Sequence, residues 1–143
     1  MEKKDPIQEA RRYLANAKTI LKDKAVKNGN CYTDSKYTRM AGNTMWNGCL
    51  IVLEYALKLE KKKDQRLEVK DFKEAASKRS IKLNKEICEA YNILHLSMGY
   101  DGTTSYATIQ DGISHMENII TWCERNAPKP KEEEAKKIES KKK

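Results

Sequence analysis

Apolar residues recur every three or four positions along most of this chain, which is the period of an amphipathic helix. The first apolar stripe covers residues 7–21. Before it, Asp5 is suited to cap a helix and Pro6 to occupy its first position. The Asn-Gly-Asn sequence at 28–30 is a stop signal. We therefore predict a first helix that begins at Pro6 and ends near Lys27.

The segment from Ser35 to Glu60 carries two apolar stripes instead of one. They consist of Met45, Val52, Tyr55, Ala56 and Leu59 on one side and of Trp46, Leu50, Leu53 and Leu57 on the other. A helix that is apolar on two faces is buried on both. This helix is therefore either the central helix of a bundle or packed partly against another subunit. Gly42 and Gly48 within it each cost about 1 kcal/mol relative to alanine, and the close approach of a neighbouring backbone would explain them.

Two helices are predicted next. A capping box over Asp71–Glu74 opens a short helix that ends near Lys78. An apolar stripe over residues 83–98 then indicates the third main helix. The sequence Gly99-Tyr100-Asp101-Gly102 ends it, and Gly99 is suited to a left-handed helix cap.

The last helix is expected from about Tyr106 to Asn126, after three hydroxyl residues at 103–105 that offer capping oxygens. Four main helices with short connections predict an all-α fold. The expected architecture is an antiparallel four-helix bundle with a short extra helix before the third main helix. It forms one domain over residues 1–127. The Lys/Glu-rich segment 128–143 has one large apolar residue, so we predict a disordered tail.

Composition narrows the class of protein. The 143 residues, 35% charged and 38% hydrophobic, suit one domain with a single core. The longest apolar run, Cys49–Leu53, is far shorter than the roughly 18 residues of a membrane span. Residues 1–5 have no apolar segment behind their charges, which argues against a secretory signal. We expect a cytoplasmic protein that does not associate with membranes.

The cysteines indicate buried thiols. Cys31, Cys49, Cys88 and Cys123 are widely spaced, with no Cys-x-x-Cys pair and no histidine at metal-ligand spacing. Without a secretory signal, we expect them to be reduced. The last three lie on apolar faces of the predicted helices and suit the role of a small buried hydrophobe. We expect no metal site and no cofactor.

Positive charge is concentrated in one segment. The net charge is +8, and residues 58–85 hold eleven Lys/Arg against five Asp/Glu. Such an excess can bind phosphate or an acidic partner, or it can be a solvated helix end and linker. Phe72 is the one aromatic residue there, so no base-stacking platform is predicted. The candidate partner-binding residues are Lys62, Lys63, Arg66, Lys78 and Arg79.

Candidate chemistry is limited to two histidines, His95 and His115. His95 lies one helical turn before Tyr100 and Asp101, where the chain reverses into the last helix. We predict that these three form a polar cluster that fixes the reversal, with a structural role in preference to a catalytic one. We assign His115 no function. No complete set of catalytic residues is evident, which favours a protein that is not an enzyme.

The layout resembles the HEPN-like helical bundles of bacteria and archaea over roughly residues 6–126. The resemblance rests on the first helix around Tyr13-Leu14, on Leu53-Glu54-Tyr55-Ala56-Leu57 in the second, and on the helix–turn–helix at 91–120. Within the last, the segment 94–102 also resembles small uncharacterised helical proteins of the Bacteroidetes type, in which a Leu-His-Leu helix end precedes an Asp-Gly turn.

This resemblance implies a bacterial homodimer. It also implies either RNA cleavage or a non-catalytic role as the partner of a nucleotidyltransferase or of a toxin–antitoxin system. The ribonucleases of the family carry an arginine shortly before a histidine near the start of the last helix, but no arginine stands at that spacing before His95 or His115. We therefore expect a non-enzymatic binding or scaffold protein of unknown ligand. The alternative is an RNA-binding module or a divergent HEPN-type ribonuclease.

Overall fold

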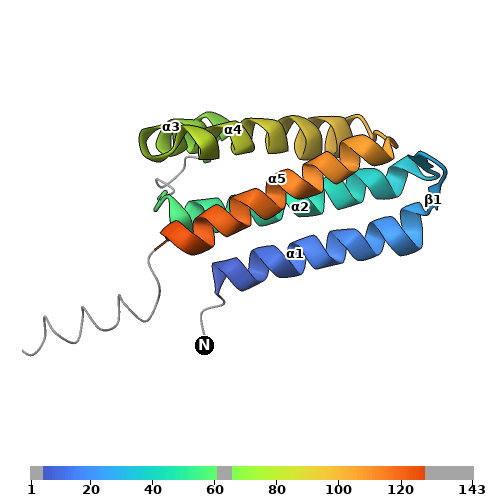
Figure 1. Ribbon diagram of the computed structural model, residues 1–143, viewed down its shortest axis with the longest axis horizontal. Helices are drawn as coiled ribbons and strands as arrows, with labels where there is room; N and C mark the ends of the chain where they lie inside the picture. The colour runs from blue at the N-terminus through green and yellow to red at the C-terminus, as the bar shows by residue number, and fades with distance from the viewer. Residues whose placement is uncertain (1–4, 61–65, 128–143) are drawn as a thin grey trace, which may run out of the picture.

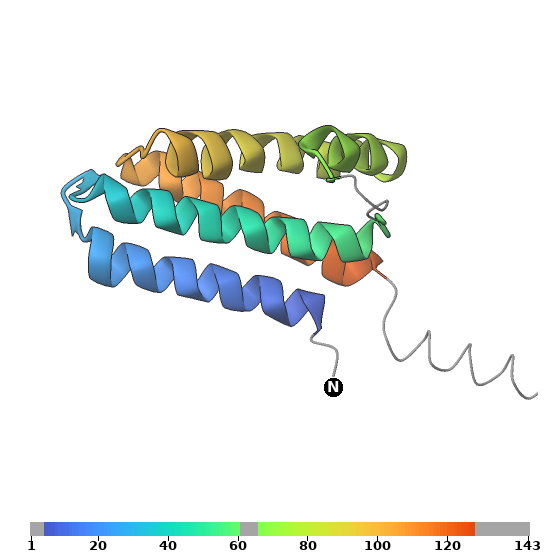
Figure 2. The same ribbon diagram turned by 180° about the vertical axis from the view of Figure 1, so that it is seen from behind.

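The computed structural model describes residues 5–60 and 66–127. Most of this part is helical, which confirms the predicted class. Long helices lie side by side and successive ones run in opposite directions, as Figure 1 and, from behind, Figure 2 show. The elements are α1 (Pro6–Ile20), η1 (Leu21–Ala25), β1 (Lys27–Asn28), β2 (Cys31–Tyr32), α2 (Ser35–Ala56), α3 (Val69–Arg79), α4 (Ile81–Ala90), η2 (Tyr91–Tyr100) and α5 (Tyr106–Asn126).

The first helix begins as predicted and ends differently. The Asp5 side chain accepts a hydrogen bond from Ile7 N at 2.9 Å. At the other end, η1 is a π-helical turn closed by Val26 N donating to Leu21 O at 3.0 Å. A two-stranded hairpin of β1 and β2 follows, with Gly29 at φ +66° in its turn. The stop signal at 28–30 was therefore a hairpin turn, which the helical period could not reveal.

Helix α2 is central, as the first of the two sequence alternatives predicts. It packs against α1, η1, η2 and α5. Both of its apolar stripes are covered by these helices: Val52 and Leu53, one from each stripe, are fully buried. The helix ends at Ala56 instead of Glu60, because Lys58 adopts a left-handed conformation at φ +53°.

Capping differs from the prediction in the middle of the chain. Asp71 is not the cap of α3 but its third residue, where Asp71 Oδ2 accepts a bond from Glu68 N at 2.8 Å. Ser80 is the extended residue that separates α3 from α4, and its side chain caps α4 by accepting a hydrogen bond from Leu83 N at 3.1 Å. The left-handed residue before α5 is Gly102, at φ +69°, and Gly99 lies within η2.

The π-helix η2 is wedged between two glycine-bearing helices. A Cβ on Gly42 of α2 would lie 2.5 Å from Met98 Cβ and 2.6 Å from the Leu94 carbonyl oxygen. On the other side, a Cβ on Gly112 of α5 would lie 2.6 Å from Ile93 Cγ2. The predicted close approach at Gly42 is confirmed. Gly48 serves the same end against α1, where its Cβ would lie 2.9 Å from Tyr13 Cβ.

The four thiols are free, and Cys49 and Cys123 are buried in the core. Burial raises the pKa of the Cys49 thiol well above its usual value, and it raises the pKa of Cys123 to about 12. Cys88 is partly buried and Cys31 is exposed. Among the described residues, no helix has the length and apolar character that crossing a membrane requires. The tail predicted over 128–143 lies outside the described residues.

Candidate functional site

The three residues of the predicted polar cluster do not meet. Tyr100 is 79% exposed and Asp101 is exposed as well. His95 is half-buried beside Trp46 and Tyr91, with ring centroids 6.1 and 5.3 Å away. Within the described residues no hydrogen bond joins His95 to Tyr100 or Asp101, and the buried His95 Nδ1 has no partner.

Backbone hydrogen bonds instead close the turn after η2. Asp101 N donates to Leu96 O at 2.8 Å, and Thr103 N donates to Ser97 O at 2.8 Å. The first of these is a π-helical bond, which spans five residues in place of four. Because the π-helix changes which side chains share a face, spacing based on an α-helix misplaced His95.

The predicted basic surface is divided. Lys62 and Lys63 lie outside the described residues. Arg66 and Lys78 line a hollow that they share with Asp71 and Glu74, so acidic side chains offset their charge.

Arg79 is a structural clamp at the helix ends. Its guanidinium donates to Ala56 O of α2 at 2.7 Å and to Asn126 O of α5 at 3.3 Å. It also lies 5.1 Å from the centre of the Trp122 ring. This arginine, at the end of α3, thus satisfies carbonyl oxygens at the ends of two other helices.

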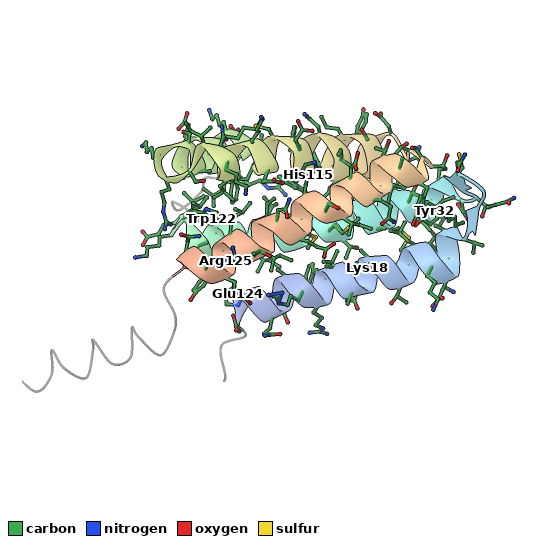
Figure 3. The ribbon with its side chains drawn as sticks, in the orientation of Figure 1. Lys18, Tyr32, His115, Trp122, Glu124 and Arg125 are labelled. Atoms are coloured by element: carbon green, nitrogen blue, oxygen red, sulfur yellow. The ribbon has the colours of Figure 1, made fainter. Side chains whose placement is uncertain are left out.

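A more specific site lies where the first helix, the hairpin and the start of α5 meet. We name it the lysine–tyrosine pocket, a hollow of about 310 Å³. Figure 3 shows two of its residues, Lys18 and Tyr32, near the start of α5. Its lining consists of Lys18, Leu21, Lys22, Lys27, Tyr32, Tyr106, Gln110 and Ile113.

The hairpin brings the two tyrosines together. Tyr32 N donates to Thr104 O at 2.8 Å, and Tyr106 N donates to Asn30 O at 3.0 Å. These bonds join the hairpin to the start of α5. The Tyr32 and Tyr106 rings then lie 5.9 Å apart at an angle of 41°. Because Tyr32 lies in a hairpin that the helical pattern did not predict, sequence reasoning missed this wall.

The charged residues that line the lysine–tyrosine pocket are all positive. None of its eight lining residues, all in the described part of the chain, is acidic. Within residues 5–60 and 66–127, Lys18, Lys22 and Lys27 form no ion pair with a carboxylate. Lys27 Nζ lies 3.9 Å from the centre of the Tyr106 ring. The lining therefore includes three lysines and, among the described residues, no acidic side chain.

Tyr32 is held in its neutral form. Desolvation raises the pKa of its phenol, the nearby Tyr106 raises it further, and a hydrogen bond with Gln110 opposes both. The wall between the lysines therefore offers a neutral hydroxyl and ring faces to a ligand. The arrangement suits an anion that carries an apolar part.

A second hollow lies at the other end of α5, between α4 and α5. We name it the far pocket, about 270 Å³ in volume, lined by Lys82, Leu83, Glu86, Asn118, Thr121, Trp122, Arg125 and Asn126. Glu86 Oε2 lies 2.6 Å from His115 Nδ1, and Asn118 Nδ2 donates to Glu86 Oε1 at 3.2 Å. Both carboxylate oxygens are thus engaged. Because Glu86 and His115 are 29 positions apart, no local spacing could reveal the pair.

Metal binding has no candidate site in the described ranges, where no group of three His, Cys, Asp or Glu side chains could hold an ion.

Comparisons with known proteins give a family without an assigned activity. The model of a domain of unknown function, DUF5618, matches residues 5–125. A solved structure of a protein of unknown function from Dyadobacter fermentans is similar, at 36% sequence identity and a TM-score of 0.76, over 84% of this chain and 93% of that one. No curated protein matches. Neither match names a HEPN-like protein, so that resemblance stays a prediction. The chain belongs to the DUF5618 family.

Proposed function

We propose that this protein is a non-enzymatic binding protein for a small organic anion and that the lysine–tyrosine pocket is its site. The observation that carries the proposal is the set of three lysines around a hollow of about 310 Å³, which form no ion pair with any residue of the described ranges. Like charges placed together repel one another, and a bound anion removes that repulsion. Leu21 and Ile113 add an apolar surface for the rest of the ligand.

The test is a titration with a panel of small anions at low salt, followed by amide NMR shifts and by the melting temperature. We expect at least one organic anion to shift amide signals of the hairpin and of the start of α5. The double variant Lys18→Gln/Lys22→Gln should lose this response, because glutamine keeps the helix propensity of lysine without its charge. Lys82→Gln in the far pocket is the matched control and should keep it. No response to any anion would contradict the proposal.

We also propose that the four long helices form a HEPN-like antiparallel four-helix bundle in a bacterial cytoplasm, acting as the non-catalytic partner of a nucleotidyltransferase or of a toxin–antitoxin system. The alternating direction of the helices supports the bundle (Figure 1). The absence of the family's arginine–histidine spacing supports a role without catalysis. Co-purification with the product of a neighbouring gene of either class is the expected result, and a stable complex with neither would contradict it.

Homodimerisation is a separate proposal. Its support is the exposure of large apolar side chains, with Met40 46% and Tyr100 79% exposed. Light scattering after size-exclusion chromatography should give twice the chain mass. A monomer at high micromolar concentration would contradict the dimer and leave the pocket proposal intact.

RNA binding is the alternative function, and Arg79 weighs against it. Its guanidinium is engaged by two carbonyl oxygens and an indole ring, which leaves it less available to phosphate. If RNA binds, affinity should fall steeply with salt, since phosphate contacts release counterions. An anisotropy titration at low salt that shows no binding would remove this alternative.

A further inference from the structure

We infer that the lysine–tyrosine pocket recognises a phosphomonoester carried by a small ring-bearing molecule; this inference rests on the proposed function of the pocket. It names the ligand class that the charges, the shape and the apolar wall of the pocket fit together.

The number and origin of the cations favour a phosphomonoester. Lys18 and Lys22 lie one turn apart on the continuous helix of α1 and η1, and Lys27 comes from β1, so the three lysines line the hollow from two segments. A phosphomonoester carries about −1.5 to −2 charges at pH 7 and has three terminal oxygens, one for each ammonium group. A carboxylate or a phosphodiester carries one charge, which leaves most of the lysine charge uncompensated.

The N-terminus of α5 also favours a strongly negative ligand. Tyr106, at the first position of this helix, and Gln110, one turn later, both line the pocket. The N-terminus of a helix carries a partial positive charge, which favours a nearby anion. The helix thus adds to the potential that the three lysines set.

The apolar wall and the volume indicate the rest of the ligand. Leu21, Tyr32 and Ile113 are buried, with 2%, 8% and 6% of their surface exposed, and form the floor. The volume of about 310 Å³ corresponds to roughly ten water molecules at about 30 Å³ each. That space holds one ring with its phosphate.

The far pocket shows why cations alone do not make such a site. Lys82 and Arg125 line it, but Glu86 lies between the same helices and engages His115 and Asn118. A dianion there would meet a carboxylate. The far pocket therefore supplies a control of similar volume in the same molecule.

The experiment compares four probes by isothermal titration calorimetry at low salt and pH 7.5. Phenyl phosphate supplies both a ring and a dianion, inorganic phosphate the charge without the ring, phenylacetate a ring with one negative charge, and methyl phenyl phosphate a diester. We expect phenyl phosphate to bind most tightly. Lys18→Gln/Lys22→Gln should weaken it by at least about tenfold, as expected for lost charged hydrogen bonds, and Lys82→Gln should not.

A pH arm tests the charge of the ligand itself. The second pKa of a phosphomonoester is about 6, so lowering the pH from 7.5 to 5 adds a proton to phenyl phosphate and should weaken its binding several-fold. Phenylacetate should change much less over this range. The charged and titratable groups facing the ligand are Lys18, Lys22, Lys27, Tyr32 and Tyr106, and no histidine or carboxylate belongs to the described lining.

Every other result contradicts a specific part of the inference or of the proposed function. If phenylacetate or the diester binds as tightly as phenyl phosphate, the phosphomonoester inference fails while the proposed function stands. If inorganic phosphate binds as tightly as phenyl phosphate, the ring contributes nothing to binding, and the inference of a ring-bearing ligand fails. If no probe binds, the inference and the proposed function both fail. Loss of binding in Lys82→Gln but not in the Lys18/Lys22 variant moves the site to the far pocket and overturns the inference.

Discussion

The two pockets along α5 are similar in size and opposite in how their charges are balanced. Figure 3 shows Lys18 and Tyr32 toward one end of this helix and Trp122 and Arg125 toward the other. In the far pocket, Glu86 is engaged by two residues of α5. In the lysine–tyrosine pocket, three lysines have no such partner among the described residues. The lining of the far pocket thus includes a carboxylate beside its two cations, whereas the described lining of the lysine–tyrosine pocket includes three lysines and no carboxylate.

This difference indicates where to look for function. A polar group whose partners come from the same chain contributes to helix packing, and its removal costs stability. Cations that repel one another without a partner contribute little to stability or lower it. Substitutions in the far pocket should therefore affect folding, and substitutions in the lysine–tyrosine pocket should affect binding.

The largest expected contrast is in the two cysteines at these ends. Cys31 lies in β2 beside Tyr32 and is exposed, whereas Cys123 lies beside Trp122 and is buried. A thiol reagent at pH 8 should modify Cys31 rapidly. Cys123 reacts only when the structure opens, so its rate should be lower by at least about a thousandfold, given a typical stability of 5 kcal/mol or more. Mass spectrometry of timed samples measures both rates, and comparable rates would contradict the packing of α5.

Alkaline pH should lower the free energy of unfolding, mainly because of two buried thiols of the core. Folded Cys49 and Cys123 keep their protons because burial raises the pKa of both thiols. Unfolded thiols ionise above a pKa of about 8.5, so the stability present at lower pH is lost as pH rises past it. We expect a loss of roughly 4 kcal/mol between pH 8 and pH 10. Urea unfolding at each pH measures it, and Cys49→Ala/Cys123→Ala should flatten the dependence.

The third prediction concerns Glu86 in the far pocket. Glu86→Ala removes the partner of His115 and of Asn118, so the free energy of unfolding should fall by about 2 kcal/mol. Glu86→Gln keeps one carbonyl oxygen and should cost less. Urea unfolding measures both variants. Full stability in Glu86→Ala would mean that the contacts of Glu86 with His115 and Asn118 do not stabilise the packing of α4 against α5.

Substitution of Arg79, near the C-terminal end of α5, should lower the free energy of unfolding by a smaller amount. Arg79→Ala removes its bonds to the carbonyl oxygens of Ala56 and Asn126. Water can replace the guanidinium at the exposed Asn126 oxygen, so the expected loss comes from the part-buried bond to Ala56 and is about 1 kcal/mol. The fluorescence of Trp122 should also change, because the cation beside its ring is gone. An unchanged spectrum and an unchanged unfolding midpoint would show that this clamp does not form.

The smallest effect belongs to the lysine–tyrosine pocket. Lys18 and Lys22 stand four residues apart, and a like-charge pair at this spacing costs about 0.2–0.5 kcal/mol. Lys18→Gln/Lys22→Gln should therefore leave the stability unchanged or raise it by this amount at low salt. The gain should vanish at 0.5 M salt, where screening is strong. A clear loss of stability would show that the lysines have internal partners after all.

The sequence by itself determined the helices, because helical periodicity and capping are local. Asp5 caps the first helix as predicted, and α5 spans the expected residues, from Tyr106 to Asn126. The double stripe of the second helix also indicated burial on two faces. Each of these signals depends on residues within one or two turns of one another, so it can be read without knowing the rest of the fold.

The tertiary structure alone decided where α2 packs and which residues meet. The pairing of Glu86 with His115 and the reach of Arg79 to Asn126 join residues 29 and 47 positions apart. The same holds for Tyr32 and Tyr106, which meet only because the hairpin is bonded to the start of α5. His95 was misplaced because η2 is π-helical, and this helix packs closely against Gly42 and Gly112. Charge balance in both pockets is a property of these long-range contacts, so no local pattern could encode it.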